Sequence, residues 1–130
     1  MRRIIGLVLA CTLVGASSPD GPQRTAEATA KLDKMLAGRV AGEAKRCVTS
    51  GILTSPIGVD DHTLLFRDGP RVWRTELQSS IECGKIGPQS FIMTDSTANR
   101  ICSGQQLDFS DSGIRGACVL GDFTPYTRAK

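Results

Sequence analysis

Hydrophobic positions divide the 130-residue chain into an apolar N-terminal run, one helical stripe and a long region of short segments. The stripe consists of apolar residues three or four positions apart, namely Ala28, Leu32, Met35 and Leu36. Thr25 stands where it can cap the first turn, and Gly38 stands where a helix commonly ends. The pattern predicts one amphipathic helix lying on the surface of the domain.

From residue 46 onward, short hydrophobic runs are separated by Gly, Pro, Asp and Ser. This texture predicts strands at Arg46–Ser50, Thr63–Phe66, Arg71–Leu77, Phe91–Thr94, Gln106–Phe109 and Ala117–Leu120. No helical period separates these segments, which favours an antiparallel sheet curled into a sandwich or small barrel. The expected fold class is mainly β (α+β by count), with an N-terminal helix.

A β-hairpin is predicted around Asp68-Gly69, because glycine accepts the positive φ that such turns require. The next residue, Pro70, lacks the N–H that a tight two-residue loop would need directly after Asp-Gly. We therefore expect a four-residue connection, with pairing that resumes between Phe66 and Arg71.

The N-terminus has the three zones of a secretory signal. Arg2 and Arg3 precede the uncharged apolar run Ile4–Val14, which is too short to span a bilayer, and small residues lead to Ala16 as the cleavage point. The predicted organisation is a signal peptide over 1–16, a flexible leader over 17–24 and a single small domain over 25–130. The chain is therefore expected to be exported, to a periplasm or to the medium.

Residues 8–11 (VLAC) also resemble a bacterial lipoprotein box, in which Cys11 would be acylated. Leu9 is bulkier than the residues usual in such boxes, and the apolar run before Cys11 is short. Release after Ala16 is favoured over anchoring through Cys11, and both fates stay open. Contact with a membrane is expected only for the anchored form.

The positive charge of the chain belongs partly to the signal. The whole chain has 16 basic and 13 acidic residues, and Arg2 and Arg3 lie in the segment that would be removed. The remaining domain is nearly neutral, so composition gives no reason to expect nucleic-acid binding.

Four cysteines remain after the signal, namely Cys47, Cys83, Cys102 and Cys118. In an oxidising compartment they predict two disulfides, with three possible connectivities. We expect Cys47–Cys118 with Cys83–Cys102, which would join the first strand to the last. The wide spacing and the absence of Cys-x-x-Cys argue against a zinc site, and we expect no metal or cofactor.

His62 is the only histidine and follows Asp60-Asp61, so these residues are the candidates for acid/base chemistry. Sequence neighbours on a strand point to opposite sides, and a polar turn at the entry to a strand is the favoured interpretation. Ser103 after Cys102 lacks the Gly-x-Ser-x-Gly context of a nucleophile, and a turn is favoured there too.

The predicted hairpin also offers a possible ligand face of Arg71, Trp73 and His62, with Arg67 and Arg74 nearby. Side chains alternate between the two faces of a strand, so Arg71 and Arg74 fall on opposite faces. This weakens the prediction of a shared ligand face. Trp73 is more simply explained as the main aromatic residue of the core.

Five segments resemble a group of small exported proteobacterial proteins of unknown function. They are 36–48 (LAGRVAGEAKRCV), 60–66 (DDHTLLF), 71–74 (RVWR), 100–103 (RICS) and 116–121 (GACVLG). The match covers residues 36–126. The resemblance implies an exported β domain with disulfides, often lipidated, and it implies no activity.

We therefore expect a non-enzymatic binding or envelope-associated module whose partner or small ligand the sequence does not identify. One alternative is a small hydrolase or lyase that uses Asp60, Asp61 and His62 with an arginine. Another is a structural surface lipoprotein anchored through Cys11.

Overall fold

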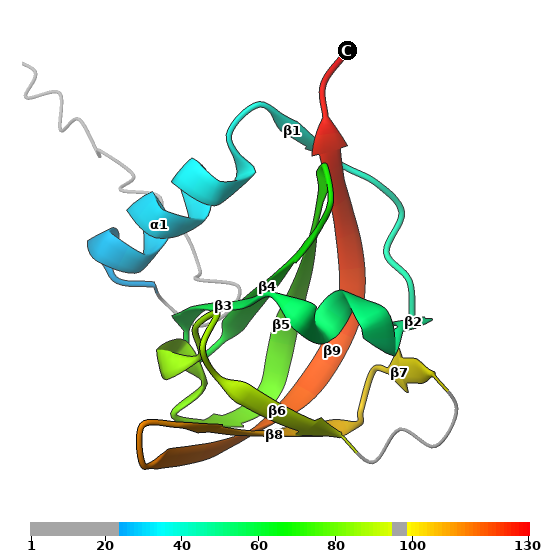
Figure 1. Ribbon diagram of the computed structural model, residues 1–130. Coiled ribbons are helices and arrows are strands. Elements are labelled where there is room, and N and C mark those ends of the chain that lie inside the picture. Colours follow the sequence, from blue (N-terminus) through cyan, green and yellow to red (C-terminus); the bar gives the residue numbers. More distant parts are fainter. Residues whose placement is uncertain (1–23, 95–98) are drawn as a thin grey trace, which may run out of the picture.

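The computed structural model describes residues 24–94 and 99–130 (Figure 1). The predicted signal peptide (1–16), most of the predicted leader (17–23) and the possible lipidation site Cys11 lie outside the described residues.

The predicted helix is confirmed as α1, Ala26–Leu36. The Thr25 hydroxyl accepts a hydrogen bond from the backbone N–H of Ala28 at 3.1 Å, as an N-cap residue does. Ala28 and Leu32 are buried, whereas the polar face is exposed. Beyond the last turn, Gly38 adopts φ +70°, a conformation that glycine takes without strain.

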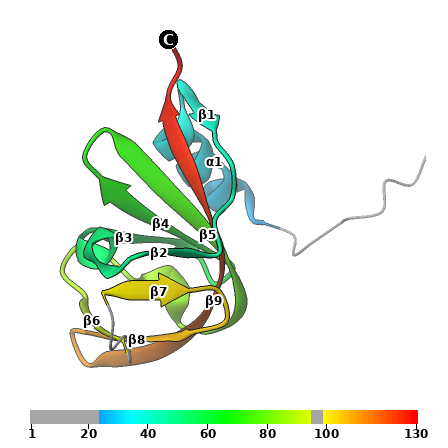
Figure 2. The same cartoon turned by 90° about the vertical axis from the view of Figure 1, so that its right-hand side faces the viewer.

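The strands are β1 (Arg39–Ala41), β2 (Cys47–Thr49), β3 (Pro56–Asp60), β4 (Thr63–Asp68), β5 (Arg71–Ile81), β6 (Phe91–Thr94), β7 (Arg100–Cys102), β8 (Gln106–Asp111) and β9 (Ile114–Arg128). Short 3-10 helices occupy Ser50–Thr54 and Cys83–Lys85. The main sheet has the order β3-β4-β5-β9-β8-β6, with β1 also paired to β9, and all its pairs are antiparallel. It curls into a half-barrel, and β2 and β7 form a separate two-stranded sheet (Figure 2). The expected mainly β, barrel-like class is confirmed.

Three strands escaped prediction. The strands β1 and β7 have only three residues each, which is too few to show alternation. The strand β3 contains Pro56 and Gly58, which the sequence pattern scores as strand breakers. Proline is tolerated here because it is the first residue of an edge strand. Gly58 is needed because a Cβ would stand 2.5 Å from the carbonyl oxygen of Cys83.

The hairpin connection is shorter than expected. Asp68 pairs with Arg71, so only Gly69 and Pro70 form the loop between β4 and β5. Gly69 has φ +57°, and a proline with its fixed negative φ can follow such a glycine in a II′ turn. Proline sits inside the loop, where no N–H is required of it. The expected pairing of Phe66 with Arg71 is therefore wrong, and Phe66 pairs with Trp73.

Two hydrophobic clusters lie on opposite faces of the sheet, because alternate residues of β4 and β5 point in opposite directions. Leu65 and Val72 pack under α1 in the smaller cluster. Phe66 and Trp73 belong to the larger cluster, which lines the curl. Trp73 is 4% exposed, in agreement with its predicted place in the core.

The two predicted disulfides are present, but the expected pairing is wrong. The bonds are Cys47–Cys102 and Cys83–Cys118. Cys47 and Cys102 are direct partners in the β2–β7 pair, and Cys83 follows β5, in which Ser80 pairs with Cys118. The first strand does pair with the last, but that first strand is β1, which carries no cysteine.

Candidate functional site

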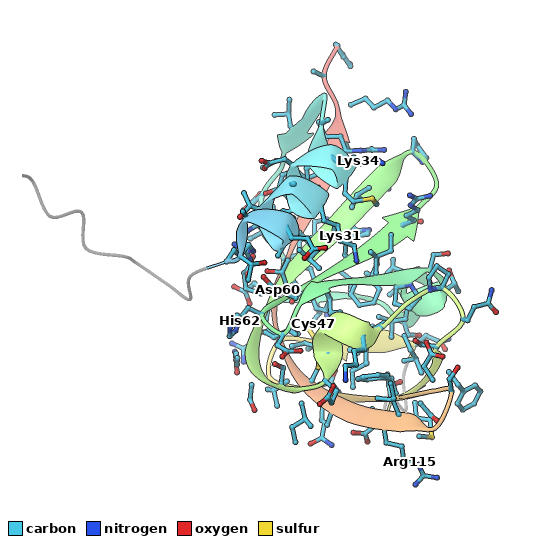
Figure 3. All side chains as sticks on the ribbon, turned by 90° about the vertical axis from the view of Figure 1, so that its left-hand side faces the viewer. Lys31, Lys34, Cys47, Asp60, His62 and Arg115 are labelled. Carbon is cyan, nitrogen blue, oxygen red and sulfur yellow. A yellow bond between two sulfur atoms is a disulfide. The ribbon has the colours of Figure 1, made fainter. Side chains whose placement is uncertain are left out.

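Asp60 is the last residue of β3, and Asp61 and His62 form the turn that leads to β4. Asp60 accepts the backbone N–H of His62 at 2.8 Å, and Asp61 accepts the backbone N–H of Gly84 at 2.9 Å. The His62 side chain is exposed and points to the outer edge of the molecule beside Asp60 (Figure 3). Within the described residues it makes no hydrogen bond or ion pair. Both carboxylates thus hold the backbone of the turn, and neither forms a dyad with His62.

Glu76, on β5, connects two arginines beside this turn. It forms an ion pair with Arg24 at 3.1 Å and another with Arg74 at 2.6 Å. The Thr63 hydroxyl also donates to Glu76 at 2.7 Å. Arg24 in turn faces Asp60 at 3.2 Å. These contacts tie the start of α1 to the sheet.

Arg74 keeps its charge in this network. Partial burial acts to lower its pKa, but the hydrogen bond and the negative charge of Glu76 outweigh burial and raise the pKa. A raised pKa means that the stabilisation is fully present at every pH below the normal arginine range and is lost only above it. The network therefore has the character of a structural clamp, in which Arg74 stays charged.

The hairpin holds a second arrangement of charge. The Arg71 guanidinium carbon lies 5.3 Å from the centre of the Trp73 ring. Asp68 forms an ion pair with Arg71 at 3.7 Å and accepts the indole N–H of Trp73 at 3.1 Å. Arg71 is therefore already neutralised by Asp68.

The possible ligand face of Arg71, Trp73 and His62 is not brought together. His62 precedes Thr63, which pairs with Glu76, whereas Arg71 pairs with Asp68 at the other end of β4. Five residue steps along a strand correspond to roughly 17 Å. The histidine and the arginine thus stand at opposite ends of the hairpin. Ser103 lies in a turn, where its N–H donates to Arg46.

A hollow of about 440 Å³ lies between the C-terminal end of α1, the tip of the β4–β5 hairpin and the paired ends of β1 and β9. Its basic lining residues are Lys34, Arg39, Arg67 and Arg128, and its apolar lining includes Met35 and Val72. Among the residues that the structure describes, no acidic one lines it. Figure 3 shows Lys34 on α1, level with the turn of the hairpin. We call this hollow the cationic pocket.

The cationic pocket was not found from the sequence. Lys34 lies outside the apolar stripe from which the helix was predicted, and Arg39 belongs to a strand that is too short to predict. Arg128 lies at the end of a strand that was predicted to finish at Leu120. Of the four cations, only Arg67 was placed near a predicted ligand face, and that face consisted of Arg71, Trp73 and His62. The four cations come from four elements, so no motif spacing could have shown them together.

No group of three or more His, Cys, Asp or Glu side chains in 24–94 and 99–130 is placed to hold a metal ion. Over the same part of the chain, no helix is long and apolar enough to cross a membrane.

Comparison with known proteins adds no relationship: no protein-family model, curated protein or solved structure matches the chain. The fold and the sites described above define a disulfide-bonded, mainly antiparallel half-barrel domain with one helix packed on its outer face.

Proposed function

We propose that this protein is exported and acts by binding a ligand rather than by catalysis. Export is supported by the three-zone N-terminal segment and by the two disulfides, which form and persist in oxidising compartments. We also propose that it belongs to the group of small exported proteobacterial proteins that its residues 36–126 resemble.

The arrangement of Asp60, Asp61 and His62 carries the preference for binding. A histidine that acts as a general base needs a partner that orients its ring toward the substrate. Here both carboxylates accept backbone N–H groups, and neither bonds the His62 imidazole. In the cationic pocket, by contrast, the charged side chains form no ion pairs with other described residues and line a hollow. A volume of this size lies within the range of small-molecule sites.

Export is tested by producing the full chain in a bacterial host and measuring the intact mass of the purified product. We expect cleavage after Ala16 and a mass four hydrogens below that of the fully reduced form. A diacylglycerol adduct on Cys11 would replace the soluble form with the lipoprotein. An uncleaved chain with five alkylatable thiols contradicts export.

The absence of catalysis is tested with the same product and a panel of chromogenic ester, phosphoester and glycoside substrates. We expect no turnover above that of the heat-inactivated protein. Turnover that disappears in His62→Gln but persists in the control Glu43→Gln would establish the hydrolase alternative. Glu43 is an exposed residue in the link between β1 and β2.

A further inference from the structure

The cationic pocket contains an unfavourable arrangement of charge. Arg39 and Arg128 are direct partners in the antiparallel pair of β1 and β9. Side chains of such partners stand about 5 Å apart at Cβ, and like charges placed there repel each other. Neither arginine forms an ion pair with a carboxylate among the described residues. The opposition of the two charges costs stability, so its presence calls for another explanation.

Two more cations reach the same hollow from different elements. Lys34 is in the last turn of α1, and Arg67 comes from β4. Arg67 contacts the Met35 sulfur at 3.7 Å, which is a weak interaction that leaves its charge uncompensated. Four positive charges thus line the pocket, and no acidic side chain from residues 24–94 or 99–130 lines it with them.

The carboxylate of Asp68 faces away from the pocket. Asp68 follows Arg67 directly in β4, so its side chain points to the other face of the sheet. There it is engaged by Arg71 and by the Trp73 indole. The carbonyl groups at the C-terminal end of α1 add a partial negative charge, and Lys34 lies in the last turn beside them.

We propose that the cationic pocket binds the phosphate groups of a small phosphate ester or diphosphate, whether free or on a lipid headgroup. Arginine guanidinium groups present paired N–H donors that match phosphate oxygens, and phosphate carries enough charge to neutralise several of them at once. A single carboxylate would leave most of the positive charge uncompensated. The pocket gives the ligand class for the proposed binding function and rests on that function.

Arg39 has one further contact that fixes its place. One of its terminal nitrogens donates to the backbone carbonyl of Pro70 in the hairpin loop. This bond links β1 to the hairpin loop. The guanidinium group is thereby partly fixed at the lining of the pocket, with N–H donors left over for a ligand. A partly oriented group loses less conformational freedom when it binds.

The test is a calorimetric titration of the oxidised, exported protein with inorganic pyrophosphate at low ionic strength. We expect saturable binding that weakens at least tenfold in the double variant Arg39→Gln/Arg128→Gln. The matched control is Arg46→Gln/Arg115→Gln, which removes the same net charge at two exposed positions outside the pocket. The control should bind within twofold of the wild type, and circular dichroism should show both variants folded.

Two results would overturn the proposal: no saturable binding, or an equal loss of affinity in both double variants, which would mean a general charge effect. Flotation with phosphatidylglycerol vesicles, compared with phosphatidylcholine vesicles, shows whether the bound phosphate belongs to a lipid headgroup or to a free compound. Co-flotation that Arg39→Gln/Arg128→Gln abolishes assigns the phosphate to a lipid headgroup, and no co-flotation assigns it to a free compound.

The phosphate site and the proposed non-catalytic function are contradicted by different results. Pyrophosphate binding together with turnover that depends on His62 would contradict the non-catalytic function and leave the pocket standing. Failure to bind pyrophosphate, without any turnover, would contradict the proposed phosphate site and leave the non-catalytic function standing.

Discussion

Arg39 and Arg128 lie directly opposite each other where β1 closes onto the end of β9. The register of these two strands places two positive charges side by side at the edge of the sheet. Opposite pairs of like charge lower stability, by an amount of roughly 0.2–1 kcal/mol. Their repulsion leads to a stability prediction that is independent of any ligand.

Replacing Arg128 by Gln is expected to raise the free energy of unfolding by a few tenths of a kcal/mol. Arg128 is the better choice for this change, because Arg39 donates a hydrogen bond to Pro70 that should be kept. The measurement is urea denaturation in a buffer free of phosphate and sulfate. Arg115→Gln, at an exposed position of the same strand, should leave stability unchanged. A loss of more than 1 kcal/mol in Arg128→Gln would mean that this arginine stabilises the fold.

The two disulfides are expected to differ in their reactivity. Cys83 and Cys118 are both 0% exposed, whereas Cys47 and Cys102 are partly accessible. A mild reductant followed by alkylation should therefore label Cys47 and Cys102 first, as read by peptide mass mapping. Labelling of Cys83 together with Cys102 at the first step would instead indicate the pairing that the sequence suggested.

Removing either bond is expected to cost about 4 kcal/mol, from the chain-entropy relation applied to closed loops of these lengths. The sequence separations are 55 for Cys47–Cys102 and 35 for Cys83–Cys118. The double alanine variants at each pair, compared by urea denaturation, check this value. A cost near zero for either variant would show that its bond contributes nothing to the folded domain.

The close approach of β5, β8 and β9 depends on Gly116. A Cβ at this position would collide with the carbonyl oxygen of Ile81 and with the ring of Phe109. Gly116→Ala is expected to destabilise the protein by roughly 1–3 kcal/mol through overpacking. Gly51→Ala is the control, because a Cβ at Gly51 meets nothing within 4 Å. Equal thermal stabilities of the two variants would contradict the packing described for this region.

Glu76 holds Arg24 and Arg74 in one network, and its replacement by Gln is expected to cost roughly 1–2 kcal/mol. The figure is modest because the Glu76 side chain is half exposed to solvent. Glu43→Gln is the control for the loss of one exposed negative charge. If both variants have the same melting temperature, the network does not stabilise the start of α1.

The local parts of the fold could be predicted from the sequence. The helix was found because a capping residue, an apolar stripe and a glycine stop all lie within fifteen residues. The strand β6 was predicted with its observed bounds, Phe91–Thr94, between breaker residues. These signals act within a few residues of each other, which is why a single sequence is enough to show them.

The pairings could not be predicted in the same way. Which cysteines bond depends on the register of β2 with β7 and of β5 with β9. The cationic pocket depends on a three-residue strand, β1, that meets the far end of β9. Both are set by contacts distant in sequence. The unpredicted strand β7 places Cys102 opposite Cys47, and the unpredicted strand β1 places Arg39 opposite Arg128.

The central functional claim is that a phosphate-bearing ligand binds in the cationic pocket, on the helix-covered face of the sheet. The most direct measurement is a two-dimensional ¹H–¹⁵N NMR titration of the oxidised protein with inorganic pyrophosphate. We expect saturable shifts centred on Lys34, Arg39, Arg67 and Arg128, with the signals of His62 and Arg115 unchanged. Shifts centred on His62 or on Arg71 and Trp73, or small shifts spread evenly over the protein, would contradict the claim.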